Sequence, residues 1–253
     1  MKEYLYGKMP ILEALRAGRR KLKHFYFSSD AEDPQLQQAL SLCQNKRVPF
    51  SQTQRAMLDA KVPDVTHQGW LAEISSYPYL DYQELAKKSE AKGKSLILAL
   101  DQIQDPQNLG AILRTAECCG VDGVLIPEDR STSITAAVAK ASAGAVEYLA
   151  ISRVTNLVRS LKDFQEKGFW VVGTGLPGVL QEHAKQPVQN IFDFDWPAKT
   201  VLVMGSEGKG MRRLTEQSCD FLIYLPLFGN ISSLNVSAAA AACLYEIVRK
   251  SRI

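Results

Sequence analysis

The spacing of apolar residues predicts that helices and strands alternate along most of the chain. In residues 7–18, Ile11, Leu12 and Leu15 fall on one face of a helix that ends at Gly18, a residue typical of helix C-termini. The apolar segment 24–27 predicts a strand. The alternation continues with helices at 35–45 and 54–60 and strands at 48–50 and 69–74. Together these elements predict a small α/β unit.

A second alternating series begins at residue 95, after a stretch (77–94) that carries one proline, several charges and little core signal, which is typical of a linker. Strands that are apolar nearly throughout are typical of a parallel sheet covered by helices on both faces. The predicted strands are 95–100, 121–126, 147–151, 169–172, 201–204 and 221–225, and the predicted helices are 107–119, 134–143, 155–167 and 235–250.

Composition narrows the class of protein. The 253 residues are 46% hydrophobic and 23% charged, as in ordinary soluble proteins, and no apolar run is long enough to span a membrane. The five cysteines lack CxxC spacing and the three histidines are far apart, so we expect reduced thiols and no metal site. The N-terminus has no apolar segment of the secretory type. We therefore expect a cytoplasmic protein with no membrane partner.

The net charge of +3 says little, but five basic residues gather within nine positions. Such a cluster attracts phosphate, or it is a solvated turn between a helix and a strand, and the charge pattern leaves both interpretations open. The cluster consists of Arg16, Arg19, Arg20, Lys21 and Lys23.

Residues 100–120 pass from a strand through a polar turn into a helix. Asp105 and Pro106 are typical of the start of such a turn, and Asn108 lies in the first helical turn. Arg114 stands two helical turns beyond the polar loop, on a helix whose other positions are mostly apolar. Taken alone, Arg114 is either a solvated arginine or a functional one.

Residues 201–214 run from an apolar strand into a loop with Gly205, Gly208 and Gly210. Parallel sheets bind ligands at the carboxyl ends of their strands, so a ligand is expected here. The glycine spacing is neither the dinucleotide fingerprint nor a P-loop. Because Glu207 would repel phosphates, the loop favours a nucleotide-like ligand without a polyphosphate.

Residues 224–250 contain a third stretch of the same kind. A strand ends at Pro226, and a polar loop leads through Ser233 and Asn235 into an alanine-rich helix. Serine and asparagine are typical helix N-caps, so part of this pattern is structural.

Together the three stretches resemble the SpoU/TrmH family of RNA ribose 2′-O-methyltransferases, within the SPOUT class. The matching motifs are NLGAILRTA from Asn108, MGSEGKG from Met204 and SLNVS from Ser233, in the family's order and at its separations. YGKMPILEALRAG and VTHQGWLAEI near the N-terminus also resemble the branch of the family that methylates a guanosine ribose in 23S rRNA.

The resemblance implies an α/β protein with two domains. Residues 1–76 would form an L30e-like RNA-substrate-binding domain and residues 77–94 a linker. Residues 95–253 would form a SPOUT methyltransferase domain with a parallel sheet and a deep trefoil knot. The implied cofactor is S-adenosylmethionine and the implied partner is 23S rRNA. The resemblance further implies a homodimer with active sites near the subunit interface.

The resemblance also implies roles for single residues. Arg114 matches the family's catalytic arginine; because a guanidinium has a pKa above about 12, we expect it to bind the adjacent phosphate and polarise the 2′-hydroxyl, with a direct base role left open. Asn108 and Glu207 would orient Arg114 and the glycine loop, and Ser233 and Asn235 would line the substrate and methionine side. The cofactor contacts would be Thr174, Gly175, Gly205, Leu225 and Leu234.

The residues leave other functions open. The first is the same reaction on a tRNA guanosine, which the N-terminal domain disfavours. The second is an RNA-binding paralogue without catalysis, which the intact Arg114, Glu207 and Asn235 disfavour. The third is a dehydrogenase with an unusual glycine loop.

Overall fold

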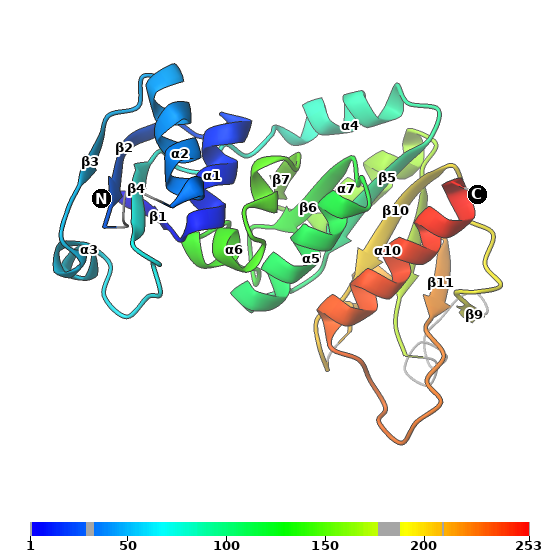
Figure 1. Ribbon diagram of the computed structural model, residues 1–253. Coiled ribbons are helices and arrows are strands. Elements are labelled where there is room, and N and C mark those ends of the chain that lie inside the picture. Colours follow the sequence, from blue (N-terminus) through cyan, green and yellow to red (C-terminus); the bar gives the residue numbers. More distant parts are fainter. Residues whose placement is uncertain (1, 29–32, 177–187, 209, 253) are drawn as a thin grey trace. The chain divides into compact units, whose positions relative to one another are not determined.

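The computed structural model describes residues 2–28, 33–176, 188–208 and 210–252, and the chain divides into two units (Figure 1). Unit 1 comprises residues 1–78 and 134–148, and unit 2 comprises residues 79–133 and 149–253. The second segment of unit 1 is therefore inserted in the sequence of unit 2.

The described residues of unit 1 include a four-stranded mixed sheet in the order β1-β4-β2-β3. Strand β4 is antiparallel to β1 and β2, and β3 is parallel to β2. Helix α1 ends at Gly18, whose φ of 64° is the left-handed value expected of a C-terminal glycine. The bounds are β1 Glu3–Tyr6, α1 Lys8–Ala17, β2 Leu22–Phe27, α2 Pro34–Asn45, β3 Phe50–Gln52, α3 Arg55–Lys61, β4 Trp70–Ile74, α6 Ala136–Ala141 and the 3₁₀ turn η1 Ala145–Glu147.

Within the described part of unit 2, seven strands form one sheet in the order β7-β6-β5-β10-β8-β11-β9, and every neighbouring pair is parallel. This confirms the predicted parallel α/β class. The bounds are β5 Ser95–Leu100, β6 Gly123–Pro127, β7 Ile151–Val154, β8 Trp170–Thr174, β9 Val188–Asn190, β10 Lys199–Met204 and β11 Phe221–Tyr224.

Helices cover both faces of this sheet. Successive residues of a strand point to opposite faces, and Ile97, Leu98, Ala99 and Leu100 of β5 are all fully buried. On one face α4 and α7 contribute to a single core cluster with β5 and β10. Helix α10, drawn in red in Figure 1, packs against α5. The bounds are α4 Tyr82–Glu90, α5 Pro106–Cys118, α7 Leu157–Glu166, α9 Arg213–Gln217 and α10 Val236–Arg252.

The structure divides the chain differently from the prediction. Residues 77–94 are not a free linker, because α4 buries Leu85 and Ala86 in the core of unit 2. Residues 134–148, which the resemblance assigns to the methyltransferase domain, cluster in space with residues 1–78. The strand predicted at 147–151 begins only at Ile151, since 145–147 form a 3₁₀ turn.

A buried ion pair is one of the contacts that join residues 134–148 to the rest of unit 1. Arg20 Nε lies 3.0 Å from Glu147 Oε1, and the two side chains are 1% and 0% exposed. The Arg20 guanidinium also lies 4.7 Å from the ring centroid of Tyr77, whose hydroxyl donates a hydrogen bond to the Val146 carbonyl at 2.8 Å. Arg20 is therefore a structural residue, and the basic cluster is not a uniform phosphate-binding surface.

The structure describes the cysteines, the groups that could bind a metal ion and the helices that could span a membrane. Each of the five cysteines is a free thiol, as predicted. Within the described ranges, no three His, Cys, Asp or Glu side chains are grouped so that they could hold a metal ion. Among the helices that the structure describes, none is long and apolar enough to cross a membrane.

Removing one member of the buried pair should destabilise unit 1. Arg20→Leu leaves a buried, unpaired carboxylate, and we expect a loss of about 3–5 kcal/mol at pH 7. The double variant Arg20→Leu/Glu147→Leu should recover most of this loss. The measurement is hydrogen exchange of β2 amides in urea.

The stability of Arg20→Leu should depend on pH in a direction that the ion pair predicts. Burial raises the pKa of Glu147 above its usual range, and the charges of Arg20 and Arg19 oppose that rise. In Arg20→Leu the main opposing charge is gone, so the folded-state pKa rises further above the unfolded value. Stability should then increase as the pH falls from 7 toward 5, because the folded state takes up the proton more readily. A pH-independent loss would contradict this account.

Candidate active site

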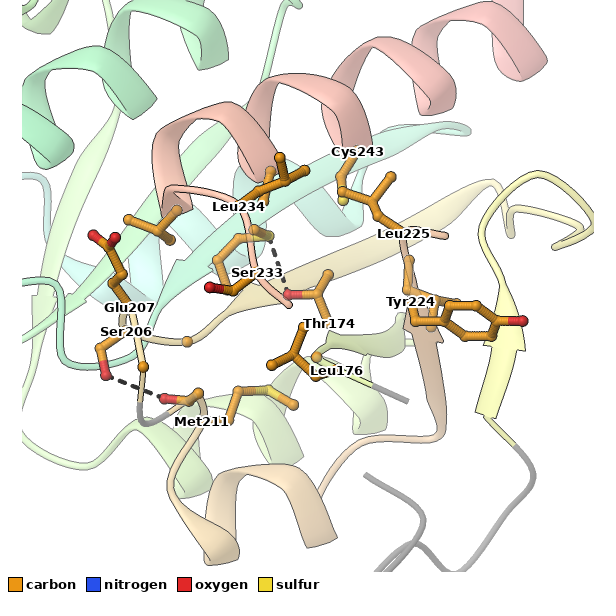
Figure 2. Close-up of a pocket in the computed structure, with 18 of the residues that line it drawn as sticks. Thr174, Leu176, Ser206, Glu207, Met211, Tyr224, Leu225, Ser233, Leu234 and Cys243 are labelled. Atoms are coloured by element: carbon orange, nitrogen blue, oxygen red, sulfur yellow. Dashed lines mark hydrogen bonds between the residues drawn. The ribbon is translucent and has the colours of Figure 1, made fainter. Parts of the chain in front are cut away.

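A pocket lies at the carboxyl ends of β8, β10 and β11, where the sequence predicted a ligand (Figure 2). Figure 2 shows Thr174 at the end of β8, Ser206 and Glu207 on the loop after β10, and Leu234 just before α10. The space inside the pocket is about 960 Å³, which includes a part that is open to solvent. Most of the lining comes from residues within 174–176, 204–208, 210–211, 223–227 and 233–243.

The glycine loop after β10 folds back on itself. Ser206 N donates to the Gly210 carbonyl at 3.0 Å, and Gly210 N donates to the Ser206 carbonyl at 2.9 Å. A Cβ at Gly205 would lie 2.2 Å from both Gly210 C and Met211 N, so only glycine fits there. Lys209 of the predicted motif lies outside the described residues. The loop therefore brings main chain, rather than side chains, to the edge of the pocket.

Asn235 joins the three stretches singled out in the sequence. Its Oδ1 accepts hydrogen bonds from Ser237 N at 2.9 Å and Ser237 Oγ at 2.6 Å, which caps α10 as predicted. The Nδ2 group therefore faces away from the helix. It donates to Asn108 Oδ1 at 2.9 Å and to Glu207 Oε2 at 3.4 Å.

Asn108 is held by its own helix start. The Asp105 carboxylate accepts from Gln107 N at 3.2 Å and from Asn108 N at 3.1 Å, and Pro106 occupies the first turn of α5. This is the turn that Asp105 and Pro106 predicted. Two capped helix starts thus place Asn108 and Asn235 within hydrogen-bonding distance.

Most of the predicted site residues lie at this pocket. Asn108 and Asn235 do not line it but hydrogen-bond to each other and, through Asn235, to Glu207. Arg114 is exposed on α5, does not line the pocket, and makes no hydrogen bond or ion pair within the described part of the chain. Those that line the pocket are Thr174, Gly175, Gly205, Glu207, Leu225, Ser233 and Leu234.

Three residues of α10 that line the pocket were not predicted as site residues. Val236, Ala239 and Cys243 recur at helical spacing on that side, a signal that was available in the sequence. Burial raises the pKa of the Cys243 thiol to about 12, so it stays protonated and acts as an apolar wall. Glu216 of α9 also lines the pocket and is 9% exposed.

The charge of the pocket restricts the class of ligand that it can bind. Among the lining residues that the structure describes, Glu207 and Glu216 are acidic and none is lysine or arginine. The apolar walls include Leu176, Ile223 and Leu225. Such a lining favours a partly apolar ligand with positive charge and disfavours a polyphosphate.

Two family models match the chain. The model described as the SpoU rRNA Methylase family matches residues 95–245. The model described as RNA 2′-O ribose methyltransferase substrate binding matches residues 4–80. The two matches fall on different parts of the sequence and together span most of it.

Similar proteins match over nearly the full chain. The 23S rRNA (guanosine-2′-O-)-methyltransferase RlmB of Pseudomonas putida is 41% identical, covering 99% of this chain and 98% of that protein. YacO of Bacillus subtilis, whose name places it in the TrmH family of tRNA/rRNA methyltransferases, is 39% identical over 98% of this chain and 96% of its own length. The crystal structure of the SpoU methyltransferase AviRb from Streptomyces viridochromogenes, in complex with AdoMet, is 22% identical. It has a TM-score of 0.78 over 98% of this chain and 90% of that chain, which shows a shared fold.

The glycine loop should not tolerate a methyl group at its first position. In Gly205→Ala the added Cβ meets main chain, so the Ser206–Gly210 pairing should open. We expect at least a ten-fold faster hydrogen exchange at the Gly210 amide, in line with the cost of about 1–3 kcal/mol typical of overpacking.

Gly208→Ala is the matched control. A Cβ there meets no atom within 4 Å, although the φ of +78° makes alanine mildly strained. Its effect on the Gly210 amide should be clearly smaller. Equal exchange in Gly205→Ala and the parent protein would show that the loop is not closed as described.

Proposed function

The chain belongs to the SpoU rRNA methylase family, and from this premise we propose that it transfers a methyl group from S-adenosylmethionine to the ribose 2′-hydroxyl of a guanosine in 23S rRNA. One observation carries the proposal. Asn108, Glu207 and Asn235, one from each motif, are hydrogen-bonded together beside a pocket for a small cationic ligand.

The pocket suits S-adenosylmethionine. When bound, this cofactor supplies a methyl group on a positively charged sulfur. The acidic lining is complementary to that charge, and the apolar walls suit an adenosine without a polyphosphate. Gly205 lets the loop close on itself, because a Cβ there would clash with the main chain of Gly210 and Met211, and the closed loop presents main chain at the pocket edge. We assign the cofactor contacts to Thr174, Gly175, Gly205, Leu225 and Leu234.

The protein's part in catalysis is positioning, exclusion of water and help with the hydroxyl proton. Arg114 binds the phosphate next to the reacting ribose and polarises its 2′-hydroxyl, since its free guanidinium is a poor base but a strong donor. The Asn108–Asn235–Glu207 hydrogen bonds hold the glycine loop against the start of α10. Ser233, on the pocket wall, lines the substrate side.

The substrate is RNA, and a 23S rRNA is favoured over a tRNA. Only RNA carries the 2′-hydroxyl that accepts the methyl group. Residues 4–80 match the substrate-binding model. The relative named as a 23S rRNA enzyme shares this region, because its match covers 99% of the chain. We assign RNA binding to the L30e-like part of unit 1, and we place the protein in the cytoplasm, where rRNA is modified.

We propose a trefoil knot for unit 2, because the segments after β8, β10 and β11 and the start of α10 all meet at one pocket. A threaded C-terminal segment explains how residues 225–235 reach a site built by earlier strands.

We also propose a homodimer. Phe228, Ile231 and Tyr245 are 95%, 76% and 57% exposed, on the loop before α10 and on α10 itself. Large aromatic and aliphatic side chains that are this exposed are typical of residues buried later at an interface. A second copy is the occupant that also completes the site, since Arg114 does not line the pocket of its own chain.

The protein should methylate a 23S rRNA transcript in vitro. With labelled S-adenosylmethionine we expect incorporation into 23S rRNA and not into tRNA transcripts. Resistance of one phosphodiester to alkaline cleavage would locate the ribose methyl group. Label on a base, or transfer to tRNA alone, would refute the proposed reaction.

Variants of Arg114 test its assigned role in the same methylation assay. Arg114→Ala should lower the rate of methyl transfer by about 100-fold or more, the order expected when a preorganised charged donor is removed. Arg114→Lys should fall between, because it keeps the charge but loses the planar fork. Calorimetry should show unchanged cofactor binding in both. A parent-like rate in Arg114→Ala would contradict the assigned role.

A charged side chain introduced among these exposed apolar residues should separate the subunits of the dimer. The parent chain of 28.0 kDa should scatter light with twice that mass. Tyr245→Glu should shift it toward the monomer and lower methyl transfer with it. Phe192→Glu changes an aromatic residue of similar exposure (51%) outside this surface and should remain dimeric. A monomeric parent protein would overturn the dimer.

A further inference from the structure

One face of the sheet in unit 1 carries aromatic rings that are partly exposed. Tyr4 of β1 and His24 of β2 both pair with Glu73 of β4, and Tyr26 lies two residues after His24 on the same strand. Alternate residues of a strand share a face, so these side chains lie together. The intervening residues, such as Leu5 and Phe25, are fully buried on the opposite face.

The rings are stacked and bordered by cations. The His24 and Tyr26 ring centroids are 4.2 Å apart with an interplanar angle of 26°. Lys61 Nζ lies 5.1 Å from the ring centroid of Tyr26 and 5.9 Å from that of Tyr4. His24 Nε2 lies 2.9 Å from Ser51 Oγ, which fixes the imidazole plane. The rings are therefore held in place while parts of their surfaces face solvent.

The charge of this face is positive. Lys2 Nζ lies 3.0 Å from Glu73 Oε2. That hydrogen bond lowers the pKa of Glu73, and the charges of Lys2, Lys23 and Lys61 lower it further. Three cations around one carboxylate leave an excess positive charge on a face of aromatic rings.

Aromatic rings beside lysines are the chemistry that binds unpaired nucleotides. Bases stack on aromatic faces and phosphates pair with the lysines, whereas bases in a duplex are already stacked and inaccessible. An acidic protein partner would use the lysines but would not need the ordered rings. The observations therefore favour single-stranded RNA as the occupant.

We propose that this face binds an unpaired segment of the RNA substrate by base stacking, at a site separate from the methyl-transfer pocket. The inference rests on the proposed function, because it takes the substrate to be RNA. The face, here called the tyrosine face, consists of Tyr4, His24 and Tyr26 with Lys2, Lys23 and Lys61.

The test measures RNA binding by the full chain. The probes are a fluorescein-labelled unstructured RNA of about 12 nucleotides, within typical single-strand site sizes, the same length as a duplex, and an abasic ribose-phosphate strand. Tyr4→Leu/Tyr26→Leu removes the rings but keeps apolar side chains. It should bind the unstructured RNA at least about ten-fold more weakly, as expected for lost stacking. The abasic strand should bind parent and variant equally.

Phe50→Leu is the matched control. Phe50 is an aromatic residue of β3 that is 37% exposed and pairs with Phe25, so it lies on the opposite face of the same sheet. Its affinity for all three probes should equal that of the parent. Circular dichroism of each variant checks that unit 1 is folded.

A lysine variant separates charge from stacking. Lys61→Gln removes one phosphate contact, so the slope of log affinity against log salt should fall by about 0.7, the value for one contact on a single strand. The tyrosine double variant should keep the parent's slope. An unchanged slope in Lys61→Gln would overturn the part of the proposal that concerns the lysines.

The results distinguish this inference from the proposed function. Parent-like affinity of Tyr4→Leu/Tyr26→Leu for unstructured RNA, or a parent protein that prefers the duplex, overturns the tyrosine face and points to a protein as its partner. With the 23S transcript, the double variant should raise KM and leave kcat unchanged. Ring-dependent RNA binding without any methyl transfer would refute the proposed function and leave the tyrosine face standing.

Discussion

The arrangement of the site depends on the side-chain amide of Asn235. One end of this amide caps α10, so the other end has a fixed direction, and it donates to Asn108 and Glu207. Residues separated by 127 and 28 positions in the sequence are thereby held together. A hydrogen-bonding group that serves two structural purposes leaves little freedom to the segments that it joins. The glycine loop is closed by its own main-chain pairing and the start of α5 by the Asp105 cap, and the Asn235 amide joins these two structures to the start of α10.

The main chain does most of the shaping in this pocket, and side chains set its charge. A loop that closes on itself around Gly205 offers main-chain groups, while Glu207 and Glu216 make the lining acidic. Two properties thus explain the sequence motif: the close approach of main chain requires the glycine at position 205, and the glutamate gives the pocket its negative charge. Neither explanation involves Arg114, which is exposed on α5 and does not line the pocket.

Local patterns predicted much of the fold because they depend on neighbouring residues. Gly18 ends α1, Asp105 starts α5, and the apolar strands form a parallel sheet, each for reasons visible within a few residues. Short elements such as β9 lacked any such signal. The placement of residues 134–148 could not be predicted, because it depends on contacts between residues far apart in sequence, such as Arg20 with Glu147 and Tyr77 with Val146, which leave no local pattern. Cofactor and substrate roles came from the family motifs, and single-residue spacing alone left them open.

The inclusion of residues 134–148 in unit 1 has a consequence for chimaeric proteins. The chain passes between the two units after residues 78, 133 and 148, so they are joined by three covalent connections. A chimaera that replaces residues 1–78 alone would remove Arg20 and leave the buried Glu147 carboxylate without its cation. A functional replacement of unit 1 must therefore carry the internal segment along.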